Sequence, residues 1–195
     1  MVIGGGQVAF RKIRTLLDCG ASVTVISPVL HPDLSELANK KSIQVIRRSY
    51  KSRDLKGAFI VIAATDTKET NRKVAKEAGR VGALVNVVDD PEPSDFIVPS
   101  VVRRGDLALA ISTGGMSPAL TRKIRTRLED SFGEEYALLV SLVEEVRSTL
   151  RRKGIRVNAE RWQNALDLDF LAQLLRTGQK DRAKAVLMKK LKKTN

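Results

Sequence analysis

Short apolar runs alternate with helix-like patterns along the first hundred residues. Four of these runs are rich in β-branched residues, namely VTVIS at 23–27, IQVI at 43–46, FIVIAAT at 59–65 and ALVNVV at 83–88. Runs that are apolar at nearly every position are typical of strands buried on both faces, with helices as the crossovers between them. The pattern therefore predicts an α/β fold built on a parallel sheet.

Two of the intervening segments show the spacing of amphipathic helices. The segment GQVAFRKIRTLLDCG predicts a helix that Gly20 ends, with one apolar face formed by Val8, Ala9, Ile13, Leu16 and Leu17. The segment TKETNRKVAKEAG predicts a second crossover helix that ends at Gly79.

The pattern changes after residue 98. The sequence DFIVPSVVRRGDLALAISTGG predicts two extended runs joined at 104–106, and a helix should follow with Ser117 as its N-cap and Pro118 at its first position. From Glu134 onward, leucines and valines at helical spacing predict a helix ended by Gly154 and further helices at 159–175 and 179–193. We expect an α/β domain at 1–98, a connecting segment at 99–131 and a small helical domain at 132–195.

Composition narrows the class of protein. The 195 residues carry a net charge of +13 without a purely basic tail, so a polyanion is an expected partner, although a solvated basic surface is the plainer alternative. The few aromatic residues lie in no stacking motif, so we expect no nucleic acid partner. No apolar run approaches the roughly 18 residues that span a bilayer, and no signal peptide is evident, so we expect no membrane association and a cytoplasmic location. One cysteine and one histidine exclude a Cys/His metal cluster.

The opening MVIGGGQVAF places glycines at a junction between a strand and a helix. Gly4, Gly6 and Ala9 fit G-x-G-x-x-A, in which the first glycine allows a tight turn, the second lets the backbone approach a pyrophosphate, and the small third residue allows close packing. The motif predicts a dinucleotide site; a Gly-rich turn without a ligand is the alternative. Ser27, at the end of the second strand, is not acidic and leaves NAD against NADP open.

Other strand ends should lie at the same edge of the sheet. Ala64 and Thr65 follow one strand and are small enough for a nucleotide to lie close, although packing and N-capping are equally ordinary roles for them. Asp89 and Asp90 follow another strand, and because adjacent side chains diverge, one could project into a cleft while the other faces water.

The loop before the helix of Ser117 has two interpretations. Thr113, Gly114 and Gly115 could form a linker, or their amides and the N-terminus of the helix could bind an anion.

Four motifs in order identify a family. GGGQVAxRK at 4–12, AATD at 63–66, NVVDxPExxDFIVPS at 86–100 and STGGMSPALxRKIR at 112–125 together resemble the precorrin-2 dehydrogenases of sirohaem synthesis. The resemblance covers positions 1 to about 130 closely and the helical remainder loosely. It implies a Rossmann-like domain, NAD-dependent oxidation of precorrin-2 to sirohydrochlorin, and a homodimer formed by the central segment.

The resemblance also implies roles for individual residues. Asp89 matches the catalytic aspartate of the family, and some members go on to insert ferrous iron. The expected cofactor site consists of Gly4, Gly6, Gln7, Val8, Ala9, Ser27, Ala64 and Thr65. The expected substrate site consists of Thr113, Gly114, Gly115 and Ser117. Precorrin-2 carries eight carboxylates, which fits a basic protein.

Two alternatives of other classes stay open. One is an NAD-sensing regulator that binds DNA through the helical domain, and the other is a chelatase that uses no NAD, which the intact glycine motif argues against. Family members carry further residues ahead of the glycines, so we also expect that the natural start lies upstream of Met1.

Overall fold

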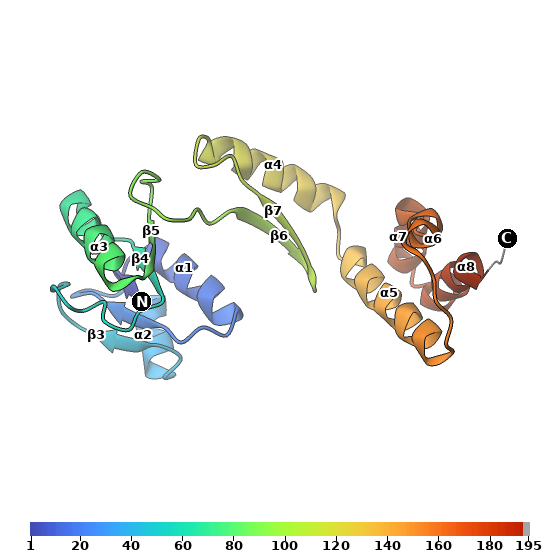
Figure 1. Ribbon diagram of the computed structural model, residues 1–195, viewed down its shortest axis with the longest axis horizontal. Helices are drawn as coiled ribbons and strands as arrows, with labels where there is room; N and C mark the ends of the chain where they lie inside the picture. Colours follow the sequence, from blue (N-terminus) through green and yellow to red (C-terminus); the bar gives the residue numbers. More distant parts are fainter. Residues whose placement is uncertain (193–195) are drawn as a thin grey trace. The chain divides into compact units, whose positions relative to one another are not determined.

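The structure of the protein is a computed structural model that describes residues 1–192 (Figure 1). The chain forms two compact units, one ending at Val98 and the other beginning at Pro99. Each unit has its own hydrophobic core. No helix among the described residues is both long and apolar enough to cross a membrane.

A five-stranded parallel sheet forms the centre of the first unit, as predicted. Its order is β3-β2-β1-β4-β5. The strands are β1 (Val2–Ile3), β2 (Thr24–Ile26), β3 (Gln44–Ile46), β4 (Ile60–Ala63) and β5 (Leu84–Val87). The strand order reverses between β1 and β4, and in open parallel sheets a ligand crevice lies at such a point, outside the carboxyl ends of the strands.

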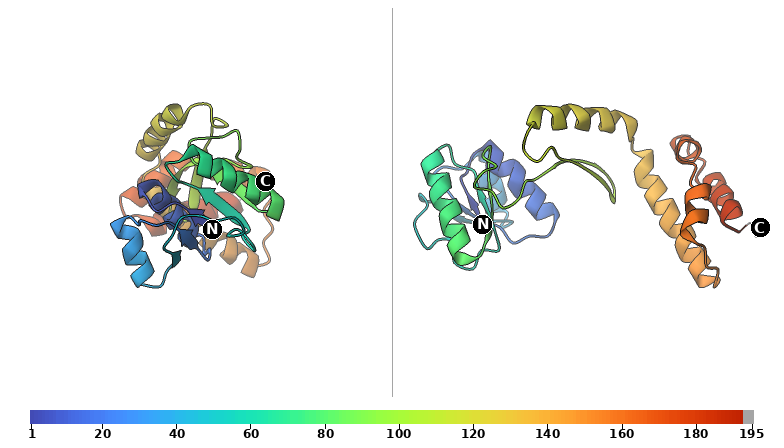
Figure 2. Two further views of the ribbon diagram at one scale, coloured as in Figure 1. Left: turned by 90° about the vertical axis from the view of Figure 1, so that its left-hand side faces the viewer. Right: turned by 45° about the horizontal axis from the view of Figure 1, so that its top comes forward.

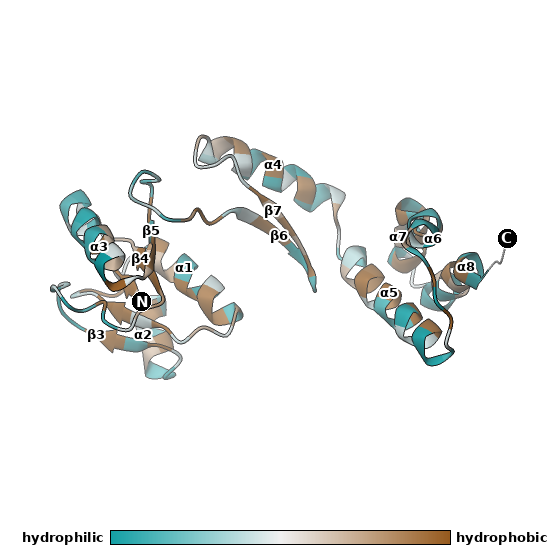
Figure 3. Ribbon diagram, in the orientation of Figure 1, coloured by the Kyte–Doolittle hydropathy of each residue, from teal (hydrophilic) through white to brown (hydrophobic). Residues whose placement is uncertain are grey.

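Helices cover both faces of this sheet (Figures 1 and 2). Val2 packs with residues of α1 (Gln7–Asp18) and α2 (Pro32–Asn39), whereas its neighbour Ile3 packs with residues of α3 (Lys68–Val81). Successive strand residues point to opposite faces, so a central strand that is covered on both sides must be apolar throughout. This explains the continuous hydrophobic runs, which Figure 3 shows as brown strands.

Two details of the first unit differ from the sequence prediction. The helix predicted to end at Gly79 continues to Val81 and ends at Gly82, which has a φ of +72°. A left-handed residue is the usual helix terminator, and Gly79 does not have that conformation. The structure also contains α2, which the sequence analysis did not predict; His31 is its N-cap and Pro32 opens its first turn.

The second unit begins with a two-stranded antiparallel sheet and a helix. β6 (Ser100–Arg104) pairs with β7 (Leu107–Ile111), and Gly105 lies in the turn with a φ of +57°. α4 (Pro118–Ser131) packs against both strands. Ser117 accepts a hydrogen bond from the backbone N–H of Leu120 and Pro118 opens the helix, so the predicted N-cap is confirmed.

The remaining helices of this unit surround an apolar core. They are α5 (Glu135–Arg152), α6 (Ala159–Ala165), α7 (Leu168–Arg176) and α8 (Lys180–Lys192). The single helix predicted at 159–175 is wrong: it is divided because the Asp167 side chain caps α7 by accepting from the N–H of Phe170. Leu138, one of the leucines at helical spacing in α5, is 49% exposed and does not belong to this core. The predicted end of the last helix, Lys193, lies outside the described residues.

Candidate functional site

The first unit places a helix N-terminus at the carboxyl edge of its sheet. β1 leads through Gly4, Gly5 and Gly6 into α1, and the turn is held because the N–H of Gly4 donates to the carbonyl of Ile26 and that of Ala64 donates to the carbonyl of Ile3. The first turn of α1 has no acidic residue and no side-chain cap. Its backbone N–H groups are therefore available to an anion.

The positions of the three glycines differ in the space around them. Gly4 has a φ of +118°, and a Cβ there would overlap the carbonyl of Ala64. A Cβ on Gly5 would overlap the carbonyl of Val29. A Cβ on Gly6 would meet no atom within 4 Å, and the φ of Gly6 is an ordinary −84°. Packing therefore explains the first two glycines, whereas Gly6 borders open space where a phosphate would lie.

The other cofactor residues predicted on this turn surround the same helix end. Gln7 is exposed, Val8 is half-buried and Ala9 is fully buried against the sheet. Ala9 thus has the packing role that the motif assigns to its third position. The need for glycine at position 5 was not predicted, because the motif leaves that position free. The only signal in the sequence is that a further glycine stands between the two motif glycines.

Ser27 follows β2 and organises the next loop. Its side chain is 6% exposed, and its hydroxyl donates to the carbonyl of Val29 over 2.6 Å. The N–H of His31 donates to the carbonyl of Gly5, which ties this loop to the glycine turn. The ring of His31 stacks on Phe10 with their centroids 5.9 Å apart, so this histidine braces α1 and α2.

The loop after β4 is held by a buried asparagine. Asn71 of α3 is 7% exposed; its amide donates to the carbonyl of Thr65, and its Oδ1 accepts from the Thr65 N–H and hydroxyl at 3.2 and 2.7 Å. Ala64 and Thr65 are half-buried beside Gly4. The loop therefore presents small side chains next to the glycine turn in a fixed conformation.

Asp89 lies in the turn that follows β5, and it is exposed with a φ of +57°. Side chains of the returning chain brace the strand ahead of it, because Ser94 and Asp95 accept from the N–H groups of Val87 and Val85. Ser94 also donates to the carbonyl of Asp90, which fixes the turn itself. Asp90 is less exposed than Asp89. Of the two adjacent carboxylates, Asp89 is thus the one that faces outward.

Lys12 of α1 is a charged group that the sequence analysis did not assign to the site. Burial and the neighbouring Arg11 lower the pKa of Lys12, and the carboxylate of Asp89 acts in the opposite direction. The charge of Asp89 therefore acts on Lys12, although the two residues come from the two ends of the first unit's sequence and form no ion pair among residues 1–192. Arg11 and Lys12 are part of the motif GGGQVAxRK, which was the available signal in the sequence. Only the fold shows which carboxylate lies near Lys12.

In the second unit, the loop that connects β7 to α4 closes on itself. The Ser117 N–H donates to the Thr113 hydroxyl at 2.9 Å, and the Gly114 N–H donates to Ser112 at 3.1 Å. Gly114 and Gly115 have φ values of +62° and +84°, which other residues rarely adopt. The four predicted substrate residues thus form one compact turn at the start of α4. Among residues 1–192, no group of three or more His, Cys, Asp or Glu side chains is placed to hold a metal.

Comparisons with known proteins match this arrangement in two parts. Residues 1–100 match a family model described as putative NAD(P)-binding. Residues 104–131 match a second model, described as the central part of a sirohaem biosynthesis protein.

Whole proteins of similar sequence are siroheme synthases. Siroheme synthase 1 of Aeromonas salmonicida is 38% identical over 92% of this chain and 39% of its own length, and siroheme synthase of Tolumonas auensis is 40% identical over 94% and 39%. The chain thus spans about two fifths of these relatives. The solved structure of SirC, precorrin-2 dehydrogenase, has a TM-score of 0.74 and 28% identity, covering 96% of this chain and 92% of SirC.

Proposed function

Residues 1–100 place this chain in the putative NAD(P)-binding family, residues 104–131 match the central part of a sirohaem biosynthesis protein, and from this premise we propose that the chain oxidises precorrin-2 to sirohydrochlorin with NAD. The observation that carries the proposal is the open helix N-terminus at Gly6. It lies in a chain that is similar over 96% of its length to SirC, precorrin-2 dehydrogenase.

The glycine turn fits the pyrophosphate of a dinucleotide. The N–H groups at the start of α1 would hold the phosphates, because the helix dipole favours negative charge there and no acidic side chain of that turn opposes it. Gly6 leaves room for the phosphates, and the small Ala64 and Thr65 leave room beside it. When bound, the nicotinamide accepts a hydride from the substrate. We assign the cofactor residues predicted from the sequence to this edge of the sheet.

Asp89 would take the proton that accompanies hydride loss. Its carboxylate is exposed at the carboxyl edge of the sheet, where a substrate can reach it, and its charge acts on the nearby Lys12. Lys12 adds a positive charge at the same edge, which suits a substrate rich in carboxylates. In this proposal the oxidation uses the carboxylate of Asp89 as the base and the ammonium group of Lys12 to attract the tetrapyrrole.

The central segment would form a homodimer and help bind the substrate. An isolated two-stranded sheet is only marginally stable. Among the described residues, α4 packs against both β6 and β7, and α5 contacts β7. Leu120 and Ile124 lie one turn apart on α4 with exposures of 50% and 36%, and Met116, in the turn before the helix, is 88% exposed; these three residues are the exposed apolar surface of the segment. A second copy of the chain would cover this surface. The adjoining turn at 113–117 would then contact carboxylates of precorrin-2.

The test is anaerobic incubation of the protein with precorrin-2 and NAD, with the absorbance of NADH and of sirohydrochlorin followed together. We expect equimolar appearance of both products. Ferrous iron added afterwards would reveal sirohaem formation, and in that reaction Asp89 could accept the pyrrole protons. We propose that the oxidation takes place in the cytoplasm. Absence of NADH, combined with tight duplex DNA binding of steep salt dependence, would favour the NAD-sensing regulator instead.

A further inference from the structure

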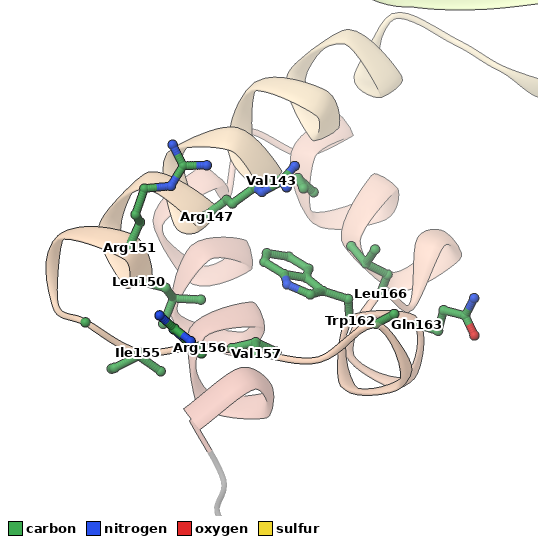
Figure 4. Close-up of a pocket in the computed structure, with 12 residues that line it drawn as sticks. Val143, Arg147, Leu150, Arg151, Ile155, Arg156, Val157, Trp162, Gln163 and Leu166 are labelled. Atoms are coloured by element: carbon green, nitrogen blue, oxygen red, sulfur yellow. The ribbon is translucent and has the colours of Figure 1, made fainter.

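A second candidate site lies within the helical part of the second unit. A cavity of about 1030 Å³ opens between α5, the connection that follows it, and α6 (Figure 4). Its volume lies at the upper end of the roughly 300–1,000 Å³ range of small-molecule sites. None of the cofactor, catalytic or loop residues discussed above belongs to its lining.

The floor of this cavity is an exposed edge of the hydrophobic core. Leu150 is 3% exposed, while Val157, Trp162 and Leu166 are half-buried and pack against the core. Figure 4 shows the indole of Trp162 lying opposite α5. A flat apolar molecule could stack on this ring and cover the adjoining aliphatic side chains.

Three arginines border the same cavity. Arg147 and Arg151 are one helical turn apart on α5, and Arg156 lies on the connection (Figure 4). All three are exposed, and the ion pairs formed among residues 1–192 include none of them. Of the acidic side chains of α5, Glu135 pairs with Arg176 and Glu145 pairs with Lys180 and Lys184, whereas Glu144 accepts a hydrogen bond from Ser148.

The two arginines of α5 carry like charges on one face of the helix. Arg147 and Arg151 lie at i and i+4, where like charges repel slightly, and neither is in an ion pair among residues 1–192. Guanidinium groups bind carboxylates in a bidentate manner and stack on flat rings. An apolar aromatic floor with a guanidinium rim therefore suits a flat ring that carries several carboxylates.

We propose that this pocket binds a polycarboxylated tetrapyrrole, the chemical class of the substrate and product proposed above. The inference rests on that proposed function for the identity of the ligand, but it concerns residues that take no part in the oxidation. Binding here would keep substrate or product on the protein before or after the reaction.

The test uses uroporphyrin, a stable tetrapyrrole with eight carboxylates, and the full chain. Trp162 is the only tryptophan, so its fluorescence reports binding. We expect saturable quenching by uroporphyrin, and at least tenfold weaker binding by the Arg147→Gln/Arg151→Gln variant. The matched control is Arg152→Gln/Lys153→Gln, which removes the same charge from exposed residues that do not line the cavity, and its affinity should stay near that of the wild type.

Energy transfer from Trp162 to a tetrapyrrole bound elsewhere also quenches fluorescence, so the affinities of the two variants decide the result. Equal weakening in both variants would indicate attraction by net charge alone and would overturn the proposal. Quenching by NAD with the same loss in the first variant would assign the pocket to nucleotides and overturn it too. Precorrin-2 turnover is measured separately: normal turnover without specific uroporphyrin binding refutes the pocket, whereas specific binding without turnover refutes only the proposed oxidation.

Discussion

Substitution of Gly6 by aspartate should abolish cofactor binding while leaving the fold intact. Gly6 is the N-cap of α1, its φ and ψ are −84° and −174°, and a Cβ there meets nothing within 4 Å. Aspartate is a preferred N-cap residue, more favourable than glycine by a few tenths of a kcal/mol. The new carboxylate would accept from the helix N–H groups and so occupy the place of the phosphate. We therefore expect an unchanged or slightly higher melting temperature.

The loss of affinity follows from charge. Two negative charges about 4 Å apart at an effective dielectric constant near 20 repel by about 4 kcal/mol. This corresponds to roughly a thousandfold weaker binding of NAD. Isothermal titration with NAD and a thermal melt, made on the same preparation, measure both expected effects.

Two further variants separate charge from volume. Gly6→Asn provides the same cap without the charge and should weaken NAD binding much less than Gly6→Asp. By contrast, Gly5→Ala should lower the melting temperature even without NAD, because a Cβ there overlaps the carbonyl of Val29. Wild-type NAD affinity in Gly6→Asp would refute the assignment of the cofactor to this helix end.

Three other predictions test the remaining elements. Asp89→Asn should lower precorrin-2 turnover by roughly 10² to 10⁴, the usual contribution of a positioned general base, with NAD affinity preserved, whereas Asp90→Asn should do much less; reversed rates would make Asp90 the base. Light scattering should give a dimer that Leu120→Glu converts to a monomer, and a monomeric wild type would contradict the interface on α4. The hydrogen bond from Arg176 lowers the pKa of Glu135. This pair therefore stabilises the fold fully at pH values above the ordinary pKa of a glutamate, and the stabilisation is lost as the pH falls through the lowered pKa. Glu135→Gln should thus cost about 1 kcal/mol near pH 7, discounted because Arg176 is exposed, and progressively less as the pH falls below the ordinary pKa of a glutamate, as measured by urea unfolding.

The sequence indicated the parallel sheet because burial on both faces leaves the central strands apolar at nearly every position. Helix ends were harder to predict, since Gly79 and Gly82 are chemically alike and only the backbone shows which one is left-handed. The short α2 was not predicted because its eight residues give little periodicity. The division between α6 and α7 depends on a cap by Asp167 that competes with a continuous helical pattern.

The same distinction holds for the candidate site: features set by neighbouring residues could be predicted from the sequence, and features set by distant residues could not. The glycine motif is local, so the sequence could predict an anion site at the start of α1. The interaction of Lys12 with Asp89 joins residues far apart in the chain, and no local pattern reveals it. The requirement at Gly5 is likewise set by Val29, a residue of another loop.

The backbone at Asp89 gives a final distinction between structure and chemistry. Its φ of +57° is uncommon for residues other than glycine, and asparagine and aspartate tolerate it best. Asp89→Asn therefore keeps both the shape and the backbone preference, whereas Asp89→Ala would add strain of about 1 kcal/mol or more and confuse lost stability with lost chemistry. Asp89→Gly removes the side chain without that strain. If Asp89 is the base, the Asn and Gly variants should melt close to the wild type and both lose turnover; an active Asp89→Gly variant would show that the carboxylate is not the base.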